Sequence, residues 1–305
     1  ITAGTVALST SGIGATTLQT ALSAGSVSIA TSATANGSDL GDINIDAAIA
    51  WSANTLTLTA HNDINVNNVV TVGAGAGITL NYVGDLSMLK NTTADTFTGK
   101  INLASTSSVH INNDVTAYTV VNSITDLQAI NTNATTLSGK YVVGDNLDNL
   151  NAAFTPIGND TTRFSGDFNG LGHTIDNINI NLPAVDFVGL FGATEGEGKV
   201  ISNIGITNAT VIGRSYVGIL TGRSLQSIEN SFSTGTVTGS GAAEEIGGLV
   251  GELASSAYVS HIYDSYSSAT VDGGSSVGGL IGYLYTHSGI GHGYIYVSDS
   301  FAKGN

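Results

Sequence analysis

Paired carboxylates are the first residue types to test for chemistry, because polysaccharide-cleaving enzymes place two acidic side chains on either side of the scissile bond. The candidates in this sequence are Asp264, Asp272 and Asp299. Asp264 and Asp299 occupy a repeat position that holds Asn203 and Asn230 earlier in the chain. A position that accepts both Asn and Asp is typical of a turn or a side-chain ladder. We therefore assign no catalytic residue and expect no enzyme activity.

Other reactive groups give no complete site. None of the six histidines has metal-site spacing, and His287 and His292 share a loop without a third ligand. Glu244 and Glu245 are adjacent in a predicted loop and are expected to be solvated. The chain has no Cys, and no Ser lies in the Gly-x-Ser-x-Gly pattern of a nucleophile elbow. We expect no bound metal and no cofactor.

Tyrosines are the residues whose placement suggests binding. Of 11 tyrosines, seven lie between 258 and 296. A tyrosine presents an apolar ring together with a hydroxyl group, which suits contact with sugars. We take Tyr285, Tyr294 and Tyr296, in or beside a predicted loop, as candidate ligand-binding residues. Tyr263 and Tyr266 match Phe232 in the repeat and are expected to be core residues.

A repeat positions these tyrosines. The phrase Gly-(Gly)-Leu-apolar-Gly, or a close variant, closes at Gly192, Gly222, Gly251 and Gly282, so the steps are 30, 29 and 31 residues. A steady period in this range indicates a repeat architecture. We interpret the four glycines as structural turns, where Gly tolerates positive φ. The alternative, a phosphate-binding loop, needs a following helix and usually a Lys, and the sequence provides neither.

The units between these glycines contain only short alternating strands, as in Thr236-Val237-Thr238. Such units bury their apolar faces by stacking, so the sequence predicts an all-β parallel solenoid. The best helix candidate is the short segment 123–130, which Ser123 can cap.

Three regions follow from the spacing. Residues 1–84 have apolar pairs at steps of 21 and 22 and are expected to form regular short coils. Residues 85–163 break this rhythm and are expected to form irregular coils with insertions and the short helix. Residues 164–305 carry the glycine repeats, and the last repeat stops before its strand is complete. We therefore expect both ends to be cuts within a longer protein.

The composition excludes several functions. The net charge is −15, from 8 Lys+Arg and 23 Asp+Glu, so nucleic-acid binding is not expected. Attraction to anionic membrane surfaces is disfavoured for the same reason. No apolar run has the length of a transmembrane helix, and the first residues do not have the features of a signal peptide.

Two sets of phrases carry a resemblance. Gly-Leu-Phe-Gly (189–192), Gly-Gly-Leu-Val-Gly (247–251) and Gly-Gly-Leu-Ile-Gly (278–282) resemble the GLUG repeat of large bacterial surface proteins. The stretches Gly-Asp-Ile-Asn-Ile (41–45) and Leu-Thr-Leu-Thr-Ala (56–60) resemble coils of filamentous-haemagglutinin-like exoproteins. The resemblance implies a right-handed parallel β-helix and an adhesin that is secreted to the bacterial cell surface by an outer-membrane transporter partner. The second repeat, which reads Gly-Ile-Leu-Thr-Gly (218–222), departs from the pattern.

These observations lead to the hypothesis of a surface adhesin segment that acts as a rigid stalk or presenting face. Its expected partner is a glycan or protein receptor on a host cell or matrix. One alternative is a filament or sheath subunit that binds copies of itself. A second, which we rank lower, is a polysaccharide-cleaving enzyme on the same fold, and it requires two or three carboxylates lining one cleft.

Overall fold

A computed structural model of the chain describes residues 6–7, 12–32, 40–196, 198–240, 244–255, 259–286 and 293–303. Strands that are parallel to their neighbours form most of it, stacked coil upon coil, so the prediction of an all-β parallel solenoid is confirmed. The chain divides into two compact units. Unit 1 holds residues 1–122, 141–145 and 171–173, and unit 2 holds residues 123–140, 146–170 and 174–305.

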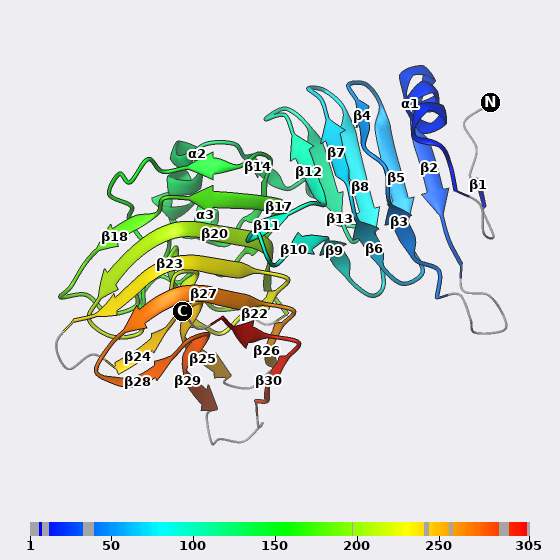
Figure 1. Cartoon of the computed structure of the whole chain (residues 1–305). Helices are drawn as coiled ribbons and strands as arrows, with labels where there is room; N and C mark the ends of the chain where they lie inside the picture. The colour runs from blue at the N-terminus through cyan, green and yellow to red at the C-terminus, as the bar shows by residue number, and fades with distance from the viewer. Residues whose placement is uncertain are drawn as a thin grey trace. The chain divides into compact units, whose positions relative to one another are not determined.

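The three coils of unit 1 that run from β3 to β13 have three short strands each, one in each of three parallel sheets. The sheets are β1-β2-β5-β8-β13, β4-β7-β12 and β3-β6-β9, and Figure 1 shows the first of them in blue to cyan. The strand bounds are β1 (Val6–Ala7), β2 (Val27–Ala30), β3 (Ile43–Ile45), β4 (Ile49–Trp51), β5 (Thr55–Thr59), β6 (Ile64–Val66), β7 (Val69–Val72), β8 (Gly77–Asn81), β9 (Leu86–Met88), β12 (Lys100–Leu103), β13 (Ser108–Ile111) and β14 (Thr119–Val121).

Alternation along these strands builds the core of unit 1. In β5, Leu56 and Leu58 are buried while the threonines between them are partly exposed. Between coils, the Asn65 side-chain amide donates to Asn44 Oδ1 at 3.0 Å. Side-chain ladders of this kind hold neighbouring coils in register.

Unit 1 also contains structure that the sequence did not predict. Helix α1 (Ala15–Ala24) lies where plain coils were expected, because Leu18 and Leu22 are four residues apart and both pack inward. It packs against β4, where Gln19 Oε1 accepts a hydrogen bond from the Ala50 amide. The polar stretch 93–99, inside the region expected to form irregular coils with insertions, forms part of an antiparallel hairpin of β10 (Lys90–Asn91) and β11 (Thr96–Phe97).

Unit 2 begins with short helices and continues as longer coils. The helical segments are α2 (Ile124–Ala129), the 3₁₀ turn η1 (Ile130–Thr132) and α3 (Ala134–Leu137). The predicted Ser123 cap is confirmed, since its side chain accepts the Asp126 amide at 3.1 Å. All but the first residue of β15 (Lys140–Val143) belongs to unit 1, as do Leu171–His173 within β17 (Asp167–Asp176). The other strands of unit 2 are β16 (Leu147–Asp148), β18 (Asn179–Asn181), β19 (Phe191–Ala193), β20 (Val200–Gly213), β21 (Thr221–Ser224), β22 (Ser227–Glu229), β23 (Phe232–Gly239), β24 (Glu244–Gly247), β25 (Val250–Ser255), β26 (Ser260–Tyr263), β27 (Tyr266–Asp272), β28 (Ser275–Gly278), β29 (Ile281–Thr286), β30 (Ile295–Ser298) and β31 (Phe301–Ala302).

Aromatic rings stack along the coils of unit 2. The ring centroids of Phe232 and Tyr266 are 5.1 Å apart, and those of Tyr266 and Phe301 are 5.2 Å apart. The ring planes are nearly parallel in both pairs. These residues come from β23, β27 and β31, which are neighbours in one parallel sheet (Figure 1). Tyr266 is therefore a core residue, as predicted, whereas Tyr263 is 40% exposed because its strand turns the ring outward.

The four repeat glycines lie inside strands, so their assignment as turns is wrong. Gly192, Gly222, Gly251 and Gly282 fall in β19, β21, β25 and β29, and none has a positive φ. A Cβ at Gly222 would lie 2.5 Å from the Val188 nitrogen. These positions need Gly because backbones approach closely there.

One left-handed position lies elsewhere in each repeat. It lies two residues before the glycine that opens the repeat phrase, and positive φ is found there in four successive coils, at Phe187, Tyr216, Glu245 and Ser276. Non-glycine residues rarely adopt this conformation, so the surrounding coil imposes it.

Candidate functional site

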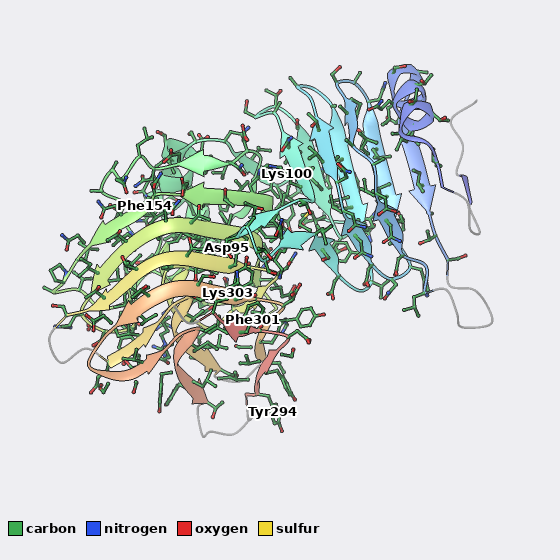
Figure 2. All side chains as sticks on the ribbon, in the orientation of Figure 1. Asp95, Lys100, Phe154, Tyr294, Phe301 and Lys303 are labelled. Carbon is green, nitrogen blue, oxygen red and sulfur yellow. The ribbon has the colours of Figure 1, made fainter. Side chains whose placement is uncertain are left out.

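Of the three candidate ligand-binding tyrosines, the structure brings two together. The ring centroids of Tyr294 and Tyr296 are 6.3 Å apart with an interplanar angle of 22°, and the two side chains are 57% and 56% exposed. Figure 2 labels Tyr294 next to β30, the strand that carries Tyr296. Tyr285 is 38% exposed but lies on β29, in a different sheet. The ring pair therefore lies on and beside β30, whereas Tyr285 lies on β29.

Next to the ring pair lies a cluster that the sequence did not reveal. The hydroxyl of Ser227 lies 3.1 Å from His261 Nδ1, and His261 Nε2 lies 2.6 Å from Glu229 Oε1. Ser227 and Glu229 are two residues apart on β22, so both point to the same side of the sheet. His261 comes from β26, the adjacent strand, in which Ile262 pairs with Ile228.

The next coil places Tyr296 directly against His261. Strands β26 and β30 pair in parallel with His261 opposite Tyr296. We name Glu229, His261, Tyr294 and Tyr296 the β26–β30 face. It combines a carboxylate, an imidazole and two exposed rings. This combination can stack on an apolar ring face and hydrogen-bond to hydroxyl groups.

The hydroxyl–imidazole–carboxylate line does not provide the other groups that acyl transfer requires. Such transfer needs an accessible nucleophile and N–H donors for the oxyanion. Ser227 is 7% exposed. Its N–H donates to Lys199 O, and the His261 N–H donates to Ser227 Oγ. The chemistry that this geometry supports best is hydrogen bonding between coils and to a bound ligand.

A second cluster gathers much of the charge of unit 2. Arg163 Nη2 lies 2.7 Å from Asp160 Oδ1, and Arg163 Nη1 lies 3.6 Å from Glu195 Oε2. Arg223 Nε lies 3.3 Å from Glu252 Oε1, and Arg223 Nη1 lies 3.9 Å from Asp160 Oδ1. Opposite charges therefore alternate through the cluster, which links strands β21 and β25 to the loop at 159–163.

Burial raises the pKa of Glu252, although Arg223 and Arg163 counteract part of this effect. The pKa of Glu245 is also raised, first by burial and then by the charge of Glu252. Glu245 lies in β24, two residues before the glycine that opens the repeat phrase, and is only partly exposed, so its prediction as a solvated loop residue is wrong. Tyr216 hydrogen-bonds to Glu245, and burial raises the pKa of this phenol.

The carboxylates first considered for catalysis do not join either cluster. Asp264 and Asp299 have positive φ and continue the left-handed position of Asn203 and Asn230, in agreement with a turn position. Among the described residues, no group of three His, Asp or Glu side chains is arranged to hold a metal ion. His287 and His292 lie outside the described residues.

Comparison with known proteins gives two relatives in sequence. No family model matches the chain. Halomucin from Haloquadratum walsbyi is 41% identical over 149 residues, which is 46% of this chain and 2% of halomucin. A protein proposed to be a Gly-rich membrane protein, from Evansella cellulosilytica, is 37% identical over 87 residues, which is 28% of this chain and 10% of that protein. The matches thus span a small part of both relatives.

One solved structure is similar in part. It is the crystal structure of a protein from Bacteroides ovatus that is proposed to be an immunoglobulin A1 protease. The TM-score is 0.44 at 21% identity, over 63% of this chain and 68% of that one. We draw no argument about activity from a similarity of this size. In the described part of this chain, no helix is long and apolar enough to cross a membrane.

The repeat alignment contained the signal for the missed cluster. Aligning Ile228 with Ile262 places the residue before each, Ser227 and His261, at the same level of adjacent coils. A search restricted to linear motifs could not find a site whose members are 34 residues apart. The exposure of each side chain was also invisible in the alignment.

Proposed function

We propose that this chain is part of an extracellular, adhesin-like surface protein, in which the solenoid forms a rigid support for a recognition surface. The observation that carries the proposal is the parallel β-solenoid in a chain related to halomucin over 149 residues. Coils joined by continuous ladders resist bending between neighbours, which suits a stalk.

The recognition surface in this proposal is the β26–β30 face, and its ligand is a neutral or basic glycan. Tyr294 and Tyr296 are exposed beside the Glu229–His261 pair, so rings and hydrogen-bonding groups meet on one outer surface. The surplus of acidic side chains disfavours polyanionic glycans. No catalytic residue is part of the proposal.

The resemblance to GLUG-repeat and filamentous-haemagglutinin-like exoproteins supports two finer proposals. The first is that the protein is secreted to a bacterial cell surface with the help of an outer-membrane transporter partner. The second is that the receptor belongs to a host cell or matrix. Self-association into a filament or sheath is the competing proposal, and the binding experiment below separates it from recognition.

The test is a glycan-array and cell-binding assay with three forms of the chain. The unchanged chain and the Tyr285→Ala control are expected to bind equally, because Tyr285 lies on another sheet. The Tyr294→Ala, Tyr296→Ala double variant is expected to lose about tenfold or more in affinity, since a stacking ring contributes on the order of 1–3 kcal/mol. Equal binding by all three forms, or concentration-dependent polymers without glycan binding, would refute the recognition surface.

A further inference from the structure

The chain contains five Asn-x-Ser/Thr motifs, and four of them lie in the described residues. They begin at Asn91, Asn133, Asn159 and Asn208, and each has Thr at its third position. The fifth, at Asn36, lies outside the described residues. This motif is the acceptor for N-linked oligosaccharides in exported proteins. A motif alone has many false matches, so the geometry of each site decides.

Three of the motifs share one local geometry. Asn91 Oδ1 accepts the amides of Thr93 and Ala94 at 3.2 and 3.1 Å. Asn133 Oδ1 accepts the amides of Thr135 and Thr136 at 2.9 and 3.1 Å.

Asn159 repeats this arrangement, since its Oδ1 accepts the amides of Thr161 and Thr162, both at 2.9 Å. In each motif the side-chain carbonyl is thus held by the backbone of the motif's own Thr and of the residue after it. At Asn91, Asn133 and Asn159 no partner among the described residues engages the amide nitrogen, and all three side chains are exposed.

The fourth motif is built differently. Asn208 lies within strand β20 and has a φ of 50°. Its Nδ2 donates to the Asp176 carboxylate at 2.8 Å, and its backbone N–H donates to Thr234 Oγ1 at 3.0 Å. The nitrogen that would carry a glycan is therefore already bound to a charged acceptor. Asn208 is exposed like the others, so exposure alone does not distinguish the sites.

We propose that Asn91, Asn133 and Asn159 are acceptors of N-linked glycans and that Asn208 is not. In the reaction, Nδ2 forms a bond to the anomeric carbon of a lipid-linked oligosaccharide, the sugar–phosphate bond breaks, the lipid phosphate leaves, and Nδ2 loses one proton. The two backbone N–H groups on Oδ1 withdraw electron density from the amide, which assists loss of that proton.

The three acceptors also share a place in the fold. Asn91 ends β10 in the hairpin, Asn133 caps α3 and Asn159 lies in the loop before β17. All three fall outside the strands that stack as coils, so a bulky glycan there leaves the ladders intact. The proposal depends on the proposed extracellular location, because N-linked transfer acts on exported chains.

The test is transfer in vitro to the purified folded chain. The reagents are a purified single-subunit oligosaccharyltransferase and a short polyprenyl-linked oligosaccharide, and occupancy is read at each site by peptide mass spectrometry. Asn91, Asn133 and Asn159 are expected to react at least tenfold faster than Asn208, because a hydrogen bond to a charged group is worth roughly 1.5–3 kcal/mol. Asn91→Gln, Asn133→Gln and Asn159→Gln each remove one signal and leave the others.

Two controls make the result decisive. Synthetic peptides of the four motifs are expected to react at similar rates, because the Asp176 contact is absent in them. The Asp176→Asn variant is expected to raise the rate at Asn208 in the folded chain. Transfer to Asn208 equal to the other three in the folded chain, or no transfer to those three when their peptides react, would overturn the proposal. This assay involves neither export nor receptor binding, so it can fail while the proposed function stands.

Discussion

Both units consist of parallel β-coils, but the coils differ in length and in the side chains that fill their cores. Unit 1 has coils of three short strands and a mostly aliphatic core, with Leu56, Leu58, Ile64 and Leu80 fully or almost fully buried beside a few rings such as Trp51. Unit 2 uses longer coils at steps of 29–31 residues and adds large aromatic rings, such as Phe232. A wider coil encloses more volume, and rings fill that volume with few side chains.

The units also differ in where their polar ladders lie. The Asn44–Asn65 hydrogen bond of unit 1 is exposed to solvent. In unit 2 the ladder Asn169–Asn203–Asn230 is buried, with amide-to-carbonyl distances of 3.2 and 2.6 Å. A buried polar group must keep its partners, whereas an exposed one can turn to water. The wider coils therefore depend on specific polar contacts more strongly than the narrow ones.

Removing one ring is expected to cause the largest change. Phe232→Ala should lower the stability of unit 2 by about 4 kcal/mol, because it opens a cavity below the stacked Tyr266. Hydrogen–deuterium exchange on peptides of each unit measures the effect. Exchange should accelerate throughout the neighbouring coils of unit 2. Faster exchange confined to the β23 peptides would show that the rings do not couple the coils.

Acid is expected to weaken unit 1 through one histidine. Burial lowers the pKa of His173 to about 4, and its Nε2 lies 3.0 Å from Ile101 O. A histidine whose folded pKa is lowered supports folding above its ordinary pKa of about 6.5 and loses that support as pH falls towards 4, by about 3 kcal/mol. Urea unfolding of the wild type and of His173→Gln, measured between pH 7 and 4, should show this slope only in the wild type. Replacing the exposed His61 by Gln is the control.

Glu252 in unit 2 is expected to act in the opposite direction. Its raised pKa means that the folded state holds the proton more tightly than the unfolded state. This contribution is fully present below the ordinary pKa of Glu and is lost as pH rises through the raised value. Exchange in unit 2 should therefore show a shallow decrease in stability with rising pH that Glu252→Gln removes. An unchanged slope in that variant would assign the pH response to another group.

Adding one methyl group at a repeat glycine is expected to be costly only where backbones touch. Gly222→Ala should cost about 3 kcal/mol, because the added Cβ would lie 2.5 Å from the Val188 nitrogen and 2.6 Å from Gly192 O. Gly25→Ala, at an extended position with no atom within 4 Å of the added Cβ, should change stability by less than about 0.5 kcal/mol. Equal effects in thermal unfolding would mean that the close approach in unit 2 relaxes freely.

Removing one asparagine from each ladder is expected to give the smallest change in stability. It also gives the clearest contrast between the buried and the exposed ladder. Asn203→Ala should cost about 2 kcal/mol, since Asn203 is 1% exposed and has hydrogen-bond partners on both neighbouring coils. Asn65→Ala should cost less than about 0.5 kcal/mol, because that bond is exposed. Chemical denaturation of both variants measures the difference, and similar costs would contradict the dependence on burial.

The features that could be predicted from the sequence are those set by the repeat or by residues close together in the chain. Period and alternation were sufficient for the parallel solenoid, and Ser123 for the start of α2, because these depend on residues close in the chain or in phase with one another. Helix α1 was missed because its ten residues lie among alternating segments and only Leu18 and Leu22 pack inward. The role of Gly222 was misassigned because a close approach depends on the neighbouring coil. The Ser227–His261–Glu229 cluster joins side chains on two coils and needed the strand register.

The parallel ladders of unit 2 also determine how it would respond to a pulling force. Each coil is held to the next by bonds that run along the stacking direction, so tension in that direction loads one rung at a time. A coil that detaches exchanges a rise of about 4.8 Å for roughly 100 Å of extended chain, given about thirty residues per coil. Unit 2 is therefore a series of sacrificial links, each able to lengthen the chain about twentyfold locally while the coils beyond it stay folded.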